Sequence, residues 1–313
     1  MRSNVSRVSA PTPSNTCGPR SLMRLRSVNY FMDISINLRT KILDKVLSPL
    51  QYGKQDYLAP YVVNISGRHQ GLIYYGTEHS QDPNQTKFTD IETKFKNFLN
   101  IYSPAKVNFA IESSIPPEVL DRGDMIKKYK ESGFLVYLSK KYGVDFFCPE
   151  PGNRIIPLLL SFSESAPEDI AAWMFLNSIA FDFRFNKSFS AQYLKDSVAT
   201  ISNLIPNASY TLFGSRLSQA IGKKLIPENS EELILGIQKL DFDSIEKLLS
   251  PFDSSTVFNI ISSDFRNVRD RFIAREILSV LEKGMSVFAV FGTNHAIAQE
   301  PVFKYFFESR KNM

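Results

Sequence analysis

The stretch that decides the fold occurs twice: residues 72–79 read LIYYGTEH, and residues 287–295 read VFAVFGTNH. Each is a continuous apolar run that ends in Gly-Thr-X-His, and together they hold two of the chain's three histidines. A short apolar run without polar alternation is typical of a strand that is buried on both faces, as in a parallel sheet covered by helices. We therefore expect both runs to be strands of one sheet, each placing a histidine beyond its carboxyl end.

Helical and strand-like segments alternate around these two runs. A hairpin is expected from residues 61–65 and 72–75, because Gly67 and Gly71 lie between them. Further strands are expected at 107–111, 144–147 and 287–291, and helices at 36–50, 90–102, 124–142 and 259–283, with a closing helix from Gln299. This alternation predicts an α/β fold with a mixed, largely parallel sheet and flanking helices.

The region from 154 to 252 has a different pattern. Its apolar residues recur at helical spacing in 171–179, 191–204, 231–240 and 244–249, with no strand-like run between them. The last strand of the sheet lies beyond this region in the sequence. We therefore expect an inserted helical cap over the sheet, and a single α/β domain over residues 33–313.

The first 32 residues form a Ser-, Arg- and Pro-rich arm with five arginines and no acidic residue. The lack of periodic apolar positions predicts a disordered arm that is dispensable for folding. The arm has no apolar centre for a secretory signal; its composition fits an organellar transit peptide, and equally a true start at Met32. We expect a cytoplasmic protein, or an organellar one if the arm is a transit peptide.

The charge and the cysteines restrict the partners. The net charge of +5 comes from the arm, since the other basic residues equal the 32 acidic ones in number. A neutral body has no basic patch for phosphate backbones, so no nucleic-acid partner is expected, and no apolar run approaches the ~18 residues of a membrane span. Cys17 and Cys148 are too few for a disulfide framework or a cysteine zinc cluster. The expected partner is a small-molecule or peptide substrate.

The carboxyl edge of the expected sheet is the candidate site. Parallel strands share this edge, and open α/β sheets bind their ligands there. The glycine of each motif is expected to turn the backbone sharply, so that the histidine points into the crevice, where imidazole binds a metal or exchanges a proton. Glu112 and Glu150 each follow a strand and should reach the same edge, while Arg269 of the long helix would hold a carboxylate or an oxyanion.

Four motifs follow one another along the chain: Gly76-Thr-Glu-His79, Ala110-Ile-Glu112, Arg269-Asp270 and Gly292-Thr-Asn-His295. They resemble the superfamily that contains TraB and PrgY, the Tiki-type metalloproteases, the ChaN-type haem-binding proteins and the erythromycin esterases. Lys130-Glu131-Ser-Gly-Phe134 and Pro149-Glu150-Pro151 are similar to two further stretches of some members. The resemblance implies an active constellation of His79, Glu112, Arg269 and His295, with a divalent metal in the Tiki-like members.

The leading expectation is a hydrolase, either an esterase or a metal-dependent peptidase. Water would be activated by His79, or by a divalent metal that His79, Glu112 and His295 hold, while Arg269 stabilises the anionic intermediate. Manganese, cobalt and zinc all suit two imidazoles and a carboxylate. The four residues should therefore converge within one cavity.

Two alternatives belong to other functional classes. The first is a haem- or metal-binding protein that resembles ChaN, with a histidine, Tyr74 or Tyr75 as the axial ligand. The second is a relative that signals without turnover. A visible absorption band after adding haemin would favour the haem carrier, and chelator-sensitive ester or peptide cleavage would favour the hydrolase.

Overall fold

The computed structural model describes residues 41–54, 56–114, 120–186, 191–221, 232–233, 236–237 and 242–311. They belong to one compact unit, Arg39–Met313. The arm expected at residues 1–32 lies outside the described residues. Among the described helices, none combines the length and the apolar character that crossing a membrane requires.

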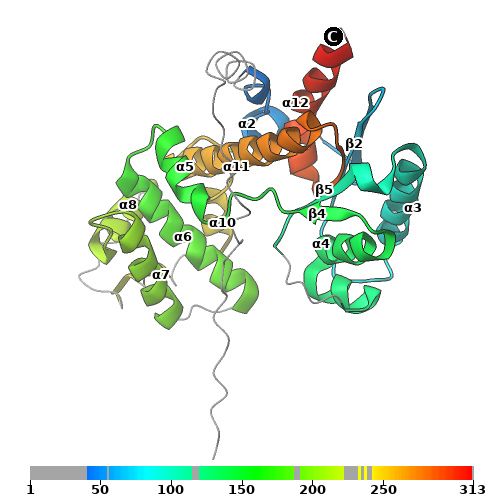
Figure 1. Cartoon of the computed structure of the whole chain (residues 1–313). Helices are drawn as coiled ribbons and strands as arrows, with labels where there is room; N and C mark the ends of the chain where they lie inside the picture. Colours follow the sequence, from blue (N-terminus) through cyan, green and yellow to red (C-terminus); the bar gives the residue numbers. More distant parts are fainter. Residues whose placement is uncertain are drawn as a thin grey trace, which may run out of the picture. The chain divides into compact units, whose positions relative to one another are not determined.

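Five strands of the described chain form one sheet in the order β1-β2-β5-β3-β4 (Figure 1). They are β1 (Tyr61–Ser66), β2 (Gly71–Thr77), β3 (Val107–Ile111), β4 (Asp145–Phe147) and β5 (Ser286–Gly292). β1 pairs antiparallel with β2, as the predicted hairpin requires, and every other pair is parallel. The predicted α/β class with a mixed, largely parallel sheet is confirmed.

Both repeated apolar runs are central strands. β2 is buried at every residue, and β5 is buried at every residue except Gly292. Successive side chains enter opposite cores: Tyr74 and Ala289 pack with residues of α11 and α12, whereas Tyr75 and Phe288 pack with residues of α3 and α4. Because both faces are covered, the two strands need apolar residues at consecutive positions.

Two helices cover each face of the sheet. One face carries α3 (Thr86–Ile101) and α4 (Arg122–Tyr142), and the other carries α11 (Val257–Glu282) and α12 (Thr293–Lys311). α11 begins with a capping box in which Thr256 and Asn259 each bond the other's backbone N–H through a side-chain oxygen. It ends just before Gly284, whose φ of 79° is in the left-handed region that favours glycine.

The described part of the inserted region contains helices joined by short loops, and no strand. It contains η2 (Gly152–Arg154), α5 (Ile155–Phe162), α6 (Pro167–Asn186), α7 (Ala191–Leu204), α8 (Tyr210–Ile221) and α10 (Phe242–Leu248). Its apolar core includes Phe258 and Ile261 from the first turns of α11. α5, α6 and α10 contact α11, which also contacts β5 (Figure 1). α11 therefore links the inserted helices to the sheet.

The expected helix at 36–50 is wrong as one continuous element. Residues 36–40 lie outside the described part, residues 41–43 are helical, and a new short helix, α2 (Pro49–Tyr52), starts after Ser48. The backbone N–H of Ser48 donates to Gln51 Oε1 at 2.7 Å at the start of this helix, and Pro49 follows Ser48. Proline lacks the N–H that a helix interior needs, so it begins a helix more readily than it continues one.

Other boundaries differ too. The closing helix begins at Thr293 rather than at Gln299, because the chain passes from β5 into α12 without a loop. His295 therefore lies in the first turn of a helix. The sequence reading missed α5 and α8, and most of the helix expected at 231–240 lies outside the described residues. A short 3₁₀ turn, η1 (Pro104–Lys106), precedes β3.

Candidate functional site

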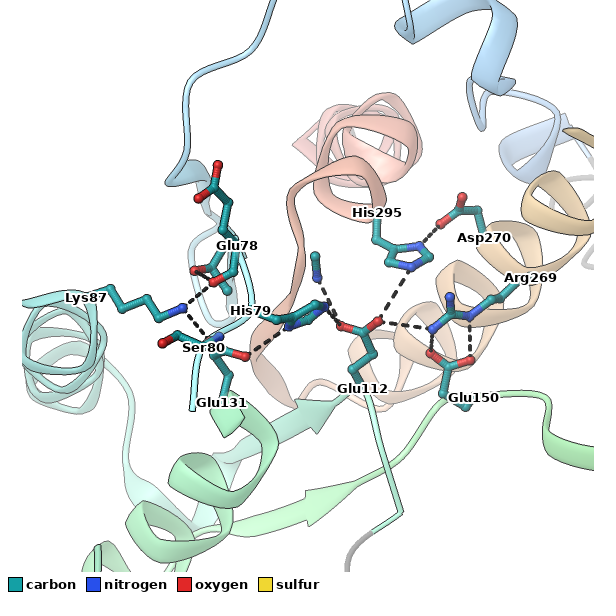
Figure 2. A network of polar contacts seen from close by, with 12 residues as sticks. Glu78, His79, Ser80, Lys87, Glu112, Glu131, Glu150, Arg269, Asp270 and His295 are labelled. Atoms are coloured by element: carbon teal, nitrogen blue, oxygen red, sulfur yellow. Dashed lines mark hydrogen bonds and ion pairs between the residues drawn. The ribbon is translucent and has the colours of Figure 1, made fainter. Parts of the chain in front are cut away.

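The carboxyl edge of the sheet brings all four expected residues together around Glu112 (Figure 2). Glu112 Oε2 lies 3.2 Å from His79 Nε2. Its Oε1 lies 3.1 Å from Arg269 Nη2 and 3.8 Å from His295 Nε2. The convergence follows from the parallel pairing of β2, β5 and β3, whose ends carry His79, His295 and Glu112. The catalytic and metal-binding roles of these residues stay predictions.

Glu112 is the centre of this arrangement. Burial alone would raise the pKa of its carboxyl, but the hydrogen bond from His79 and the positive charges around it hold this pKa far below its usual range. The backbone N–H of Gly292 also donates to Glu112 Oε2 at 3.0 Å. Glu112 is therefore a fixed anion that joins the end of β3 to the end of β5.

Arg269 is held by two carboxylates. Its Nε and Nη2 donate to Glu150 at 2.8 and 2.6 Å, and Nη2 also donates to Glu112. Glu150 follows β4, as expected from the sequence, and it reaches the edge through Arg269. Because two carboxylates already bind the Arg269 guanidinium, its main role is to position Glu112. Arg269 is therefore a weaker donor to an oxyanion than the sequence suggests.

His79 is held between two carboxylates. Its Nε2 faces Glu112, and its Nδ1 lies 2.9 Å from Glu131 Oε2. These two hydrogen bonds raise the pKa of His79 to about 9, although partial burial opposes the rise. His79 is therefore protonated at neutral pH, and a protonated imidazole cannot take a proton from water. The expectation that His79 activates water does not fit this environment.

Glu131 is a site residue that the sequence reading did not select. It also accepts from Ser80 N at 2.9 Å and pairs with Lys87 Nζ at 2.5 Å. α4 breaks at Lys130, whose φ of 55° and ψ of −138° are non-helical, and this break turns Glu131 toward the sheet edge. Gly133 permits the break, since a Cβ there would lie 2.2 Å from Met125 O. Strained backbone of this kind is often found at functional sites.

His295 has a different environment. Its Nδ1 lies 2.6 Å from Asp270 Oδ1, which also accepts from Gln299 Nε2 at 2.6 Å. Asp270 and His295 are buried, with 1% and 7% exposure. A carboxylate only accepts, so Nδ1 carries a proton and donates it to Asp270. At 3.8 Å from Glu112, that Nε2 lies beyond hydrogen-bond distance of the carboxylate.

The expectation that the glycine of each motif turns the backbone sharply is wrong. Neither Gly76 nor Gly292 has a positive φ, so neither turns the backbone through a conformation reserved for glycine. Gly76 instead allows close packing, because a Cβ there would lie 2.9 Å from Ala296 Cβ and 3.0 Å from Thr293 Cα. A Cβ on Gly292 would lie 3.4 Å from His79 Nε2. The first glycine serves packing, and the second borders the site.

The site opens into a pocket of about 730 Å³. Its lining includes His79, Glu112, Arg269 and His295. The rest of its lining includes residues of α6 and α11, and also Leu249 and Phe252 from the segment between α10 and α11. A volume of this size suits a small-molecule ligand, for which about 300–1,000 Å³ is usual.

The tyrosines of the haem alternative do not border this pocket. Tyr74 is buried in the core beneath α11 and α12. Tyr75 is buried on the other face of the sheet, where its hydroxyl donates to Asp90 at 2.8 Å. A tyrosine-bound haem therefore gains no support from their positions, and haem binding stays a prediction.

The expected metal ligands fit a divalent ion by type but not by arrangement. Both histidines are held through Nδ1 by carboxylates, which is the usual support of a metal-bound imidazole. Within the described ranges, however, no group of three or more His, Cys, Asp or Glu residues is arranged to hold a metal ion. His79 Nε2 contacts Glu112 directly, so His79 would have to lose its proton and move to bind a metal. Metal binding stays a prediction.

No protein-family profile, curated protein or solved structure matches the chain in the comparisons made. The resemblance to the TraB, Tiki, ChaN and erythromycin-esterase superfamily therefore stays a prediction.

Proposed function

We propose that this chain is a hydrolase of small esters or amides, of the type that the TraB/Tiki/erythromycin-esterase resemblance implies, and that His295 is its general base. The observation that carries the proposal is the pair of Asp270 and His295. Asp270 holds Nδ1–H of the imidazole, while Nε2 faces the pocket without a hydrogen bond to Glu112. This is the arrangement by which hydrolases prepare a histidine to take a proton.

The network around His295 carries more negative than positive charge. The cations of the network are His79, Lys87 and Arg269, and its carboxylates are Glu112, Glu131, Glu150 and Asp270. Three positive charges therefore face four negative ones, which leaves one net negative charge while His295 is neutral. A proton arriving on His295 cancels this charge. The partly buried setting strengthens the effect, since charges interact more strongly where water is excluded.

The reaction needs water and one carbonyl substrate. Water attacks the carbonyl carbon while His295 Nε2 takes its proton, and a tetrahedral oxyanion forms. Protonated His79 stands next to Glu112 and supplies positive charge near that oxyanion, while its two N–H groups stay bound to Glu112 and Glu131. When the carbon–oxygen or carbon–nitrogen bond breaks, protonated His295 returns the proton to the leaving group. Arg269 holds Glu112, and Glu112 orients His79.

A metal-dependent hydrolase is the second candidate. The observation that favours it is the carboxylate bonded to Nδ1 of each histidine. His79, Glu112 and His295 would hold the ion, and manganese, cobalt or zinc would polarise a carbonyl or lower the pKa of water.

The test is an activity profile of the full-length protein against p-nitrophenyl esters, small amides and dipeptides. The proposal expects one of these classes to be hydrolysed, and His295→Ala to lower the rate by at least about 10²-fold. His69→Ala is the matched control, because His69 is exposed in the turn between β1 and β2. Equal rates for wild type and His295→Ala, with both proteins folded by circular dichroism, would reject the proposal.

A further inference from the structure

One face of α11 lines the pocket beyond the histidines. Ser262, Phe265, Arg266 and Arg269 border the same cavity, and their spacing places them on one side of the helix. Arg269 is the member of this row that reaches the strand ends, where it binds Glu112. Arg266 lies nearly one turn earlier, beside the aromatic ring of Phe252 at 5.7 Å. The row therefore extends the site from the strand ends toward the inserted helices.

The three arginines that border the pocket differ in their partners. Arg269 binds Glu150 and Glu112, and Arg184 binds Glu246. Arg266 forms no ion pair with any residue in the described ranges. A partly buried guanidinium without a carboxylate is poorly compensated, and a bound anion would supply the missing charge.

The hydroxyl of Tyr52 lies next to Arg266 and has an unused donor. Tyr52 borders the same pocket at 2% exposure, and its buried hydroxyl forms no hydrogen bond of normal geometry within the described part of the chain; its interaction with the Arg266 side chain partly offsets the rise in its pKa. Burial raises the pKa of Tyr52 to about 12, so its hydroxyl keeps its proton and can donate. A buried polar group normally has a hydrogen-bond partner, so an unused donor here points to a ligand.

We propose that Arg266 and Tyr52 form a carboxylate-binding subsite, and that the substrate is a small molecule with an apolar body and one carboxylate. That this ligand is a substrate rests on the proposed hydrolase function, whereas its binding at the subsite does not depend on that function. One uncompensated guanidinium matches one negative charge, and its planar N–H groups match the two oxygens of a carboxylate. The acidic lining residues Asp56 and Glu78 are exposed, where water weakens their repulsion of an anion.

The apolar body would lie against the aromatic wall beside Arg266. Trp173 and Phe265 form a tilted ring pair at 5.1 Å, and Phe252 lies under the guanidinium. All three rings border the pocket. Trp173 is the single tryptophan of the chain, so its fluorescence reports a ligand in this pocket without any need for turnover.

The test is a binding titration of full-length protein with two matched probes, dansylglycine and its neutral amide. Energy transfer from Trp173 to the dansyl group measures each dissociation constant. We expect wild type to bind the carboxylate at least about tenfold more tightly than the amide, and Arg266→Gln to reduce this preference to about twofold or less. Arg266→Lys, which keeps the charge, should retain part of the preference.

Arg271→Gln is the matched control, since Arg271 lies on the same helix but pairs with Asp44 and does not border the pocket. It should keep the wild-type preference. Equal binding of the two probes to wild type would overturn the subsite, and so would an unchanged preference in folded Arg266→Gln. Because binding is measured without turnover, a protein that shows the preference but hydrolyses nothing would refute the proposed hydrolase and leave the subsite standing.

Discussion

Replacing glycine by alanine should lower stability in the first Gly-Thr-X-His motif and activity in the second. In Gly76→Ala, the new methyl group would lie 2.9 Å from Ala296 Cβ and 3.0 Å from both Thr293 Cα and Tyr61 O. Two of these neighbours are backbone atoms, so α12 or β1 must shift. In Gly292→Ala, the new methyl group would lie 3.4 Å from His79 Nε2 and 3.8 Å from His295 Cδ2, where only side chains are near.

The magnitudes follow from these distances. Overpacking of this kind costs about 1–3 kcal/mol, and replacing a strand glycine by alanine returns about 0.5–1 kcal/mol, so Gly76→Ala should lower the free energy of unfolding by up to about 2.5 kcal/mol. Gly292→Ala makes near-ordinary contacts and should change that free energy by less than about 1 kcal/mol. Its methyl group lies within 4 Å of both imidazoles, near the place of the water in the proposed reaction, and a small displacement of reacting groups can cost about 10²-fold in rate.

Urea unfolding followed by circular dichroism measures the first effect, and ester or amide hydrolysis measures the second. Gly76→Ala should be less stable but active at low temperature, whereas Gly292→Ala should be stable and nearly inactive. The reasoning fails if Gly292→Ala is destabilised as much as Gly76→Ala, or if Gly292→Ala retains the wild-type rate.

The remaining predictions concern Asp270, the protonation of His79 and the metal. Asp270→Asn keeps the size of a buried side chain, so it should stay folded while kcat falls by about 10²- to 10⁴-fold; steady-state kinetics beside a melting curve checks this. In a histidine NMR titration, His79 should have a pKa of about 9, and Glu131→Gln should lower it, while a pKa near 6.5 in wild type would contradict the account. The pKa of His79 is higher in the folded state than in the unfolded state, so the stability that His79 supplies is complete below about pH 6.5 and is lost as the pH rises through about 9. Urea midpoints measured below about pH 6.5 and above about pH 9 would show this loss. Elemental analysis and a chelator test separate the two candidate hydrolases: the histidine-base mechanism keeps its rate after chelation, whereas loss of activity that manganese, cobalt or zinc restores would favour the metal site.

The sheet and its functional edge could be predicted from the sequence. The strand expected at 107–111 has those same bounds in β3, and the final strand differs from the expected one by a single residue at each end. Apolar runs without alternation identify strands with two covered faces, and parallel strands must share a carboxyl edge. These two facts were enough to bring His79, Glu112 and His295 together.

The partners of the histidines could not be predicted in the same way. Asp270 lies 25 positions from His295, and Glu131 lies 52 positions from His79. Both carboxylates are on helices, where local periodicity separates buried from exposed faces but does not show which polar residue reaches the sheet edge. Glu131 also depends on the break at Lys130; the dipeptide Ser132-Gly133 marks an interruption there, but it does not show where the Glu131 side chain points. Asp270 stands beside Arg269 in the sequence, so only its burial distinguishes it.

The central claim is that His295 takes the proton from water, and chemical rescue tests it most directly. The measurement is the hydrolysis rate of His295→Ala with increasing concentrations of imidazole, beside wild type and His69→Ala. The account predicts that His295→Ala loses at least about 10²-fold in rate, and that imidazole restores part of that loss with saturation while leaving the other two proteins unchanged. A His295→Ala protein that hydrolyses at the wild-type rate, or an equal effect of imidazole on all three proteins, would contradict it.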